Sequence, residues 1–153
     1  ERHVLRNLAI QERLIATNEA TQRDYLSAAA GHLRTTKNAA IAEQYLNKAL
    51  QMGEDTALEA VALETLAEIY YRDGRLHDAT KLYRQLYESK TGSQAVLNNL
   101  SNLLIKAGDL KSGAYLLQEL LERGIEDPVR KERITANLQA ILHAIDQTEK
   151  NPE

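Results

Sequence analysis

The chain has 153 residues, of which 43% are apolar and 27% are charged, and its formal charge is −3. With 2 Pro, 7 Gly and no Cys, this composition predicts one all-helical domain and excludes disulfides, thiolate zinc sites and cysteine nucleophiles. Acidic and basic residues are interspersed and no apolar run reaches the roughly 20 residues that span a bilayer, so neither nucleic acid binding nor direct membrane insertion of this fragment is expected.

Residues 1–17 are predicted to form an extra helix with apolar side chains on two sides. One side holds Val4, Leu5, Leu8 and Ile15, and the nearly opposite side holds Ile10 and Leu14. A helix that is apolar on both sides needs a neighbour on each of them. We therefore expect either a preceding repeat, of which this helix is a remnant, or a homo-oligomer that forms through this helix.

Residues 21–52 are predicted to form a degenerate first helix pair. The apolar and small positions of its two helices are Leu26, Ala29, Ala30 and Leu33, followed by Ala42, Leu46, Ala49 and Leu50. The second of these patterns recurs 37 residues later, around Ala79. No glycine separates the two helices, but Asn38 is a residue type that caps a helix N-terminus well.

Residues 56–90 give the clearest helix pair. Apolar residues recur at helical spacing on both sides of Gly74, at Leu63, Leu66, Ala67 and Tyr70 and then at Leu76, Ala79, Tyr83 and Leu86. Glycine tolerates positive φ, so Gly74 is predicted to end the first helix and let the second turn back. The small residues Ala67 and Ala79 allow the two helices to approach closely.

Residues 93–124 repeat this unit at an offset of 34 residues. The offset pairs Leu63 with Leu97, Leu66 with Leu100, Ala67 with Ser101, Gly74 with Gly108, and Ala79 with Gly113. Apolar positions meet apolar positions and small residues meet small residues, which is the signature of a structural repeat. We therefore expect a second helix hairpin that turns at Gly108 and is closely packed at Ser101 and Gly113.

Residues 128–147 are predicted to form a capping helix. Asp127 is a suitable N-cap and Pro128 suits the first helical position. Its apolar stripe is Ile134, Leu138, Ile141, Leu142 and Ile145, and its opposite side is polar with small alanines. A helix of this kind closes a stack of repeats, and residues 148–153 are expected to form a tail.

These units resemble tetratricopeptide repeats, which have a helix–turn–helix of 34 residues with Leu, a small residue, Tyr, Gly and Ala in this order. The matching residues are Ala67 and Ser101, Tyr70, Gly74 and Gly108, and Ala79. Leu63 and Leu97 stand where Trp is usual, and Thr91 and Ile125 stand where Pro usually closes the unit. The resemblance implies an all-α, right-handed α-solenoid of about three repeats with a C-terminal capping helix.

In proteins of this family, the first helices of successive repeats line a concave face that commonly holds an extended peptide. The resemblance places on that face Ser27, Gly31 and Arg34, then Glu64, Glu68, Tyr71 and Arg72, and then Asn98, Asn102, Ile105 and Lys106. Glu132 and Gln139 would extend it. Residues 64, 68 and 71, and residues 98, 102 and 105, are spaced to share one helix face away from the core stripe.

Asn98 and Asn102 give the strongest single signal on this face. Each amide offers a donor and an acceptor, so two amides one turn apart can pair with an extended backbone of any sequence. The alternative is that both asparagines are simply exposed. Glu64 and Glu68 either select a basic ligand segment or are solvated, and they argue against a site that grips a terminal carboxylate.

No catalytic, metal or cofactor site is expected. The four histidines, His3, His32, His77 and His143, have no metal-ligand spacing, and the glycines form neither a phosphate-binding loop nor a nucleophile elbow. Solvated or packing roles account for the histidines.

The sequence therefore predicts a non-catalytic module that binds a peptide or partner helix as part of a larger protein or assembly. The alternative is a structural or regulatory spacer, or a self-association domain. A bacterial assembly factor of the cytoplasm or periplasm would suit these features, and the compartment stays open.

Overall fold

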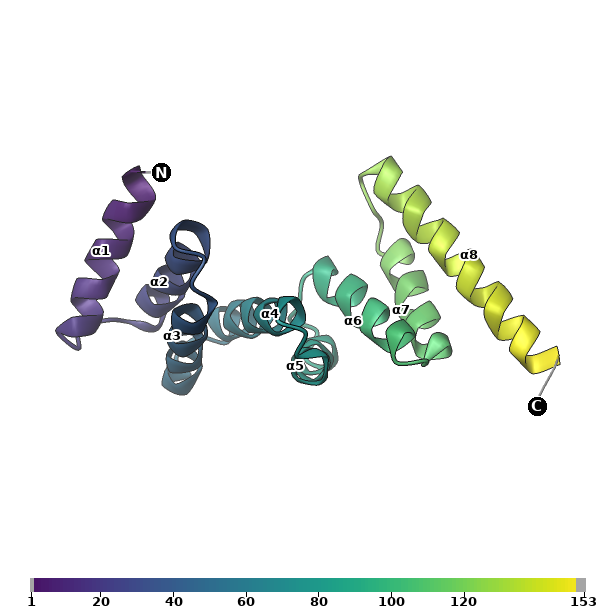
Figure 1. Cartoon of the computed structure of the whole chain (residues 1–153), viewed down its shortest axis with the longest axis horizontal. Coiled ribbons are helices and arrows are strands. Elements are labelled where there is room, and N and C mark those ends of the chain that lie inside the picture. Colours follow the sequence, from purple (N-terminus) through teal and green to yellow (C-terminus); the bar gives the residue numbers. More distant parts are fainter. Residues whose placement is uncertain (1, 151–153) are drawn as a thin grey trace. The chain divides into compact units, whose positions relative to one another are not determined.

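The computed structural model describes residues 2–150, which form eight α-helices and no β-strand (Figure 1). The helices are α1 (Arg2–Ala16), α2 (Gln22–Thr35), α3 (Ala39–Met52), α4 (Thr56–Arg72), α5 (Leu76–Glu88), α6 (Gln94–Lys106), α7 (Leu110–Glu122) and α8 (Pro128–Lys150). The predicted all-helical class is confirmed. A right-handed solenoid of three repeats stays a prediction.

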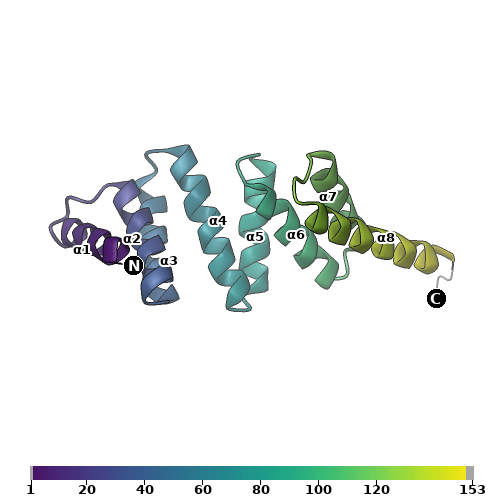
Figure 2. The same ribbon diagram turned by 90° about the horizontal axis from the view of Figure 1, so that it is seen from above.

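The chain divides into two compact units, one up to Leu82 and the other from Tyr83 onward, with the boundary inside α5. Within the first unit α1 packs on α2, α2 on α3, and α3 on α4; within the second, α6 packs on α7 and α7 on α8 (Figure 2). Each unit is thus built from helices that pack on their neighbours in sequence, as helical repeats do.

In the first unit, capping side chains determine where helices begin, and residues with positive φ lie where they end. Thr21 and Asp24 form a reciprocal capping box at the start of α2, and Asn38 accepts from the backbone N–H of Ile41 at the start of α3. The predicted Asn38 cap is confirmed. Gly74 has φ +76°, as predicted for the residue that ends α4, and Lys37 takes the left-handed conformation between α2 and α3 with φ +52°.

The core of the first unit lies between α2, α3 and α4. Its buried members are Ala29, Ala42, Leu46, Ala62, Leu66 and Ile69, and Tyr45, Tyr70 and Leu82 pack against them half-buried. Three of the six buried residues are alanines, so the helices approach closely instead of being held apart by large side chains.

Gln22 joins three helices of this unit through its side-chain amide. Its Nε2 donates to the carbonyl of Ala49 in α3 at 3.2 Å, and its Oε1 accepts from the N–H of Asp55, the N-cap of α4, at 3.0 Å. Gln22 is only 1% exposed. These two bonds hold the start of α2 against the end of α3 and the start of α4.

In the second unit, α6 and α7 form a hairpin with the predicted turn. Gly108 has φ +88° at the end of α6, and Asp109 caps α7 by accepting from the N–H of Ser112. Asp127 accepts from the N–H groups of Val129 and Arg130 at the start of α8, which confirms the predicted cap.

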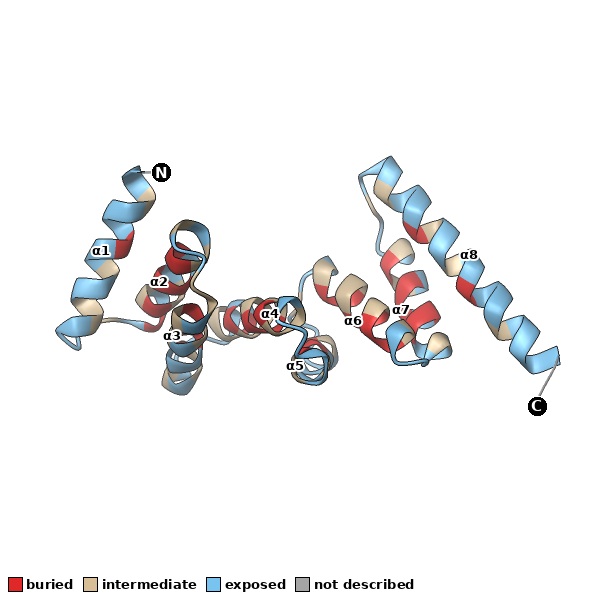
Figure 3. Cartoon of the chain, viewed as in Figure 1, coloured by how far each residue is buried: buried red, intermediate tan, exposed pale blue. Residues whose placement is uncertain are grey.

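Buried residues gather on the facing sides of α6 and α7 (Figure 3). Ser101 is fully buried, and its hydroxyl donates to the carbonyl of Asn98 one turn earlier. Gly113 is buried where α7 meets Ile105 of α6. Both small residues therefore lie at the helix crossing, as predicted.

The capping helix α8 differs from its prediction in two respects: it continues to Lys150, so residues 148–150 of the predicted tail are helical, and one residue of its predicted apolar stripe is exposed. Ile134 and Ile141 are buried and Leu138 and Ile145 are half-buried, but Leu142 is 51% exposed. Within the second unit α8 packs on α7, and one neighbouring helix covers a narrower stripe than the five predicted residues span. Lys150 is the last residue of α8, and residues 151–153 of the predicted tail lie outside the described residues.

Candidate functional site

The site residues predicted in the first unit lie on α2 and α4. Arg34 is exposed near the end of α2, whereas Glu64, Glu68 and Tyr71 are half-buried on α4. Arg72 Nη2 stands 3.8 Å from Glu68 Oε2, one helical turn away. A solvent-accessible pair of this length contributes little to stability, so both side chains are available to a ligand at small cost.

The site residues predicted in the second unit lie on α6. Asn98, Asn102 and Ile105 are half-buried, and Lys106 is exposed at the helix end. The opposite side of α6 supplies the core residues Val96, Leu97, Leu100, Leu103 and Leu104. Ile105 lies against Gly113 of α7 and so contributes to helix packing.

The two asparagines of α6 differ in their hydrogen bonds. Asn98 Nδ2 donates to Asn99 Oδ1 at a long 3.4 Å, and Asn99 in turn donates to the hydroxyl of Tyr83 at 3.0 Å. Within residues 2–150, the amide of Asn102 makes no hydrogen bond. A half-buried amide with unused donors and an unused acceptor can bind a polar partner without breaking an existing bond.

Three residues that were predicted to lie on the binding face line a groove between α1 and α2. Ser27, Gly31 and Arg34 line one side of this cavity of about 230 Å³. Residues of α1 line the other side, namely Val4, Asn7, Leu8 and Gln11. No role was predicted for Asn7 and Gln11, although their spacing of four residues places both amides on one face of a helix.

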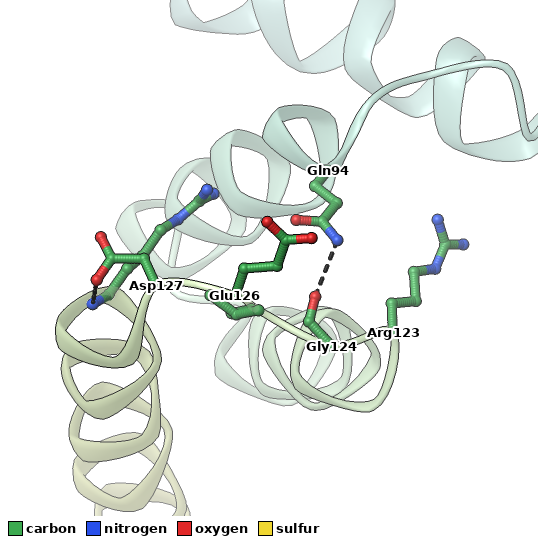
Figure 4. Close-up of a pocket in the computed structure, with 7 residues that line it drawn as sticks. Gln94, Arg123, Gly124, Glu126 and Asp127 are labelled. Atoms are coloured by element: carbon green, nitrogen blue, oxygen red, sulfur yellow. Dashed lines mark hydrogen bonds between the residues drawn. The ribbon is translucent and has the colours of Figure 1, made fainter.

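A larger pocket of about 610 Å³ lies in the second unit, around the loop between α7 and α8 (Figure 4). Gln94, at the start of α6, donates from Nε2 to the carbonyl of Gly124 at 2.9 Å. Arg123, Glu126, Asp127 and Arg130 are among the other lining residues. This lining mixes both signs of charge, and Asp127 already accepts from the first N–H groups of α8.

Among the ionisable groups of the described chain, the hydroxyl of Tyr87 has the most strongly shifted pKa. Its hydroxyl donates to Glu119 Oε2 at 2.8 Å, and Arg123 Nη2 donates to Glu119 Oε1. The hydrogen bond to Glu119, with burial as the second cause, raises the pKa of Tyr87 to about 12. The Tyr87–Glu119 hydrogen bond therefore connects the end of α5 to α7.

Tyr70 and Arg75 form a second polar contact at the turn after α4. The guanidinium carbon of Arg75 lies 3.9 Å from the centroid of the Tyr70 ring, and Arg75 Nη1 donates to both carboxylate oxygens of Glu43 at 3.1 Å. Burial and the Glu43 carboxylate raise the pKa of Tyr70. This cluster connects α3 and α4 with the turn that precedes α5, within the first unit.

His32 is the one buried histidine in residues 2–150. Its Nε2 lies 2.9 Å from Glu12 Oε1 of α1, its Nδ1 lies 3.3 Å from Thr36 Oγ1, and its ring packs on Tyr45. Glu12 and His32 therefore hold α1 on α2, a packing role of the kind that the sequence predicted for the histidines.

Residues 2–150 contain neither a metal-binding cluster nor a helix that could cross a membrane. Among these residues, no three His, Cys, Asp or Glu side chains are grouped closely enough to hold a metal ion. No helix in the same range has the length and apolar character that a bilayer crossing requires.

Comparison with models of known protein families gives no match, and a search of curated proteins finds no significant relative.

Proposed function

We propose that this chain is a protein-interaction module of the tetratricopeptide kind, which binds a peptide segment or a partner helix and catalyses no reaction. The 34-residue repeat, the positive φ angles of Gly74 and Gly108 and the α6–α7 hairpin support this proposal. Each unit offers its own candidate binding side chains, all of them exposed or half-buried. In the first unit they are Arg34 on α2 and Glu64, Glu68, Tyr71 and Arg72 on α4, and in the second unit they are Asn98, Asn102, Ile105 and Lys106 on α6.

The unpaired amide of Asn102 is the observation that supports this function best. Asn98 lies one turn earlier, about 6 Å along the helix axis. In an extended peptide, the backbone groups on one edge recur every two residues, or about 6.8 Å. The two amides thus match the repeat of an extended backbone and can each bond to one of its N–H or C=O groups.

The test is selection from a displayed library of random peptides about 12 residues long, followed by titration of the selected peptides. The variant Asn98→Ala/Asn102→Ala should weaken binding about tenfold, because each lost hydrogen bond contributes roughly 0.5–1.5 kcal/mol. The matched control is Gln85→Ala/Gln147→Ala, which removes two exposed amides from α5 and α8. Equal affinity for the parent and both variants would show that the asparagines take no part in binding.

Self-association through α1 is a second candidate function. Leu5 and Ile10 of α1 are 49% and 50% exposed, and large apolar side chains on a surface helix often belong to an interface. Sedimentation of the chain and of Leu5→Gln/Ile10→Gln over a range of concentrations separates the two functions. A concentration-dependent dimer that the double variant abolishes would favour self-association.

A further inference from the structure

The groove between α1 and α2 has a narrow apolar floor. Leu8 of α1 and Gly31 of α2 are both buried there, and a Cβ added to Gly31 would lie 3.0 Å from Leu8 Cδ1. The glycine thus lets the two helices approach closely beneath the groove. An α-helix with its side chains is about 10–12 Å wide, so a cavity of about 230 Å³ suits an extended chain better than a helix.

The α1 wall of the groove presents two side-chain amides one turn apart. Asn7 is exposed and Gln11 is half-buried, and within the described residues neither amide makes a hydrogen bond. Their spacing of about 6 Å along the axis is close to the two-residue repeat of an extended backbone. This wall can therefore pair with the edge of a peptide regardless of the peptide's sequence.

The α2 wall supplies the charge. Arg34 is exposed, and within residues 2–150 its guanidinium forms no ion pair. No acidic side chain lines the groove. A guanidinium offers five N–H donors in a planar fork, which binds a carboxylate through two parallel hydrogen bonds.

The surroundings of the groove are cationic although the whole chain is acidic. Residues 2–35 contain five arginines and three acids, a formal charge of +2, against −3 for the complete sequence. Each of the three acids is engaged locally: Glu12 with His32, Glu19 with the Thr17 hydroxyl and Asp24 with Thr21. These carboxylates keep their charge, but the five arginines outnumber them, so the net charge of residues 2–35 is positive.

We propose that the α1–α2 groove binds an extended peptide segment that carries an acidic side chain. The peptide backbone bonds to the amides of Asn7 and Gln11, the acidic side chain pairs with Arg34, and a small apolar side chain lies over Leu8. The inference rests on the proposed function, since it treats the chain as a binding module, and it assigns to Arg34 a ligand of stated charge. It concerns a surface that contains neither Asn98 nor Asn102.

The test selects random displayed peptides on the immobilised full chain, as above, and compares their composition and affinity at low and moderate salt. We expect the selected peptides to be enriched in Asp and Glu. Arg34→Gln and Asn7→Ala/Gln11→Ala should each weaken binding about tenfold. The matched control is Arg13→Gln, which removes an equal charge from an exposed position of α1 outside the groove and should weaken binding less than twofold.

The variants replace half-buried or exposed side chains, and circular dichroism checks that each keeps its helix content. Equal losses from Arg34→Gln and Arg13→Gln would overturn the proposal, because they would indicate unspecific attraction. Binding that Asn98→Ala/Asn102→Ala abolishes but Asn7→Ala/Gln11→Ala does not would overturn it while leaving the proposed function intact. If no peptide is selected, both proposals fail. A dimer in sedimentation that Arg34→Gln dissociates would show that a second copy of the chain occupies the groove, which also overturns the proposal.

Discussion

Gly113 of α7 and Ile105 of α6 are so close that a Cβ added to Gly113 would lie 2.5 Å from Ile105 Cγ1 and 3.2 Å from the carbonyl oxygen of Ser101. Real Cβ atoms do not approach other heavy atoms to 2.5 Å, so any larger residue at position 113 must displace Ile105. The α6–α7 hairpin of the second unit thus depends on the absence of one side chain.

We expect Gly113→Ala to lower the free energy of unfolding by about 1 kcal/mol. Overpacking costs about 1–3 kcal/mol and outweighs the gain of roughly 1 kcal/mol in helix propensity. Urea denaturation followed by circular dichroism measures the change. In an Ile105→Ala background the obstructing side chain is gone, and Gly113→Ala should become stabilising. The same loss in both backgrounds would contradict the proposed contact.

Glycine is required at position 108 for a different reason than at position 113, namely the backbone conformation and not the space for a side chain. An added Cβ would meet no atom within 4 Å, but φ is +88°. We expect Gly108→Ala to cost about 1 kcal/mol from the left-handed conformation, and Gly108→Asn to cost less, because asparagine tolerates it better. Thermal unfolding of both variants tests this order. Equal melting temperatures for the parent and the alanine variant would argue against the left-handed turn.

Gln22 and Gln94 make comparable bonds in different surroundings. Each is the first residue of a helix and donates to a carbonyl at the end of the next helix, but Gln22 is buried and Gln94 is exposed. Gln22→Leu should cost about 1–3 kcal/mol, because it leaves the Ala49 carbonyl and the Asp55 N–H without their partner. Gln94→Leu should cost well under half as much, since water can replace the lost bond. Comparable losses measured by urea denaturation would refute this difference.

Tyr87 makes stability depend on pH in alkaline solution. Its pKa is raised from 10.0 to about 12 in the folded chain, so folding favours the protonated phenol. The stabilisation is complete below pH 10 and is lost as the pH rises towards 12, because the unfolded chain releases its proton first. The difference in urea midpoint between the parent and Tyr87→Phe should therefore shrink from pH 9 to pH 12. A constant difference across this range would show that the Tyr87–Glu119 bond is not formed in solution.

The helix turns were predictable because their causes lie within a few residues. Gly74 and Gly108 end helices since their φ angles are positive, and Asn38 caps α3 through a bond to a residue three positions later. The offset of 34 residues also identified Ser101 and Gly113 as close-packed positions. These features follow from local backbone chemistry and from the periodicity of apolar residues.

The long-range contacts were not predictable, because their partners depend on how the helices pack. Gln22 reaches residues 27 and 33 positions away, and His32 meets Glu12 across 20 positions. The groove between α1 and α2 was missed for the same reason: Asn7 and Gln11 line it only because of the way α1 is oriented on α2. Leu142 was predicted to belong to the apolar stripe of α8, but it lies at the edge of that stripe, where α7 does not cover it.

Within each unit, the packing of helices on their neighbours in sequence also affects how fast the chain folds. A contact between adjacent helices closes a short loop, so little chain entropy is lost before the contact forms. Domains dominated by such local contacts fold within microseconds to milliseconds, whereas peptide synthesis adds only about 5–20 residues per second. The helices of a hairpin can therefore meet soon after the second one has left the ribosome, and the hairpin's remaining apolar face is covered when the next helices emerge and pack on it.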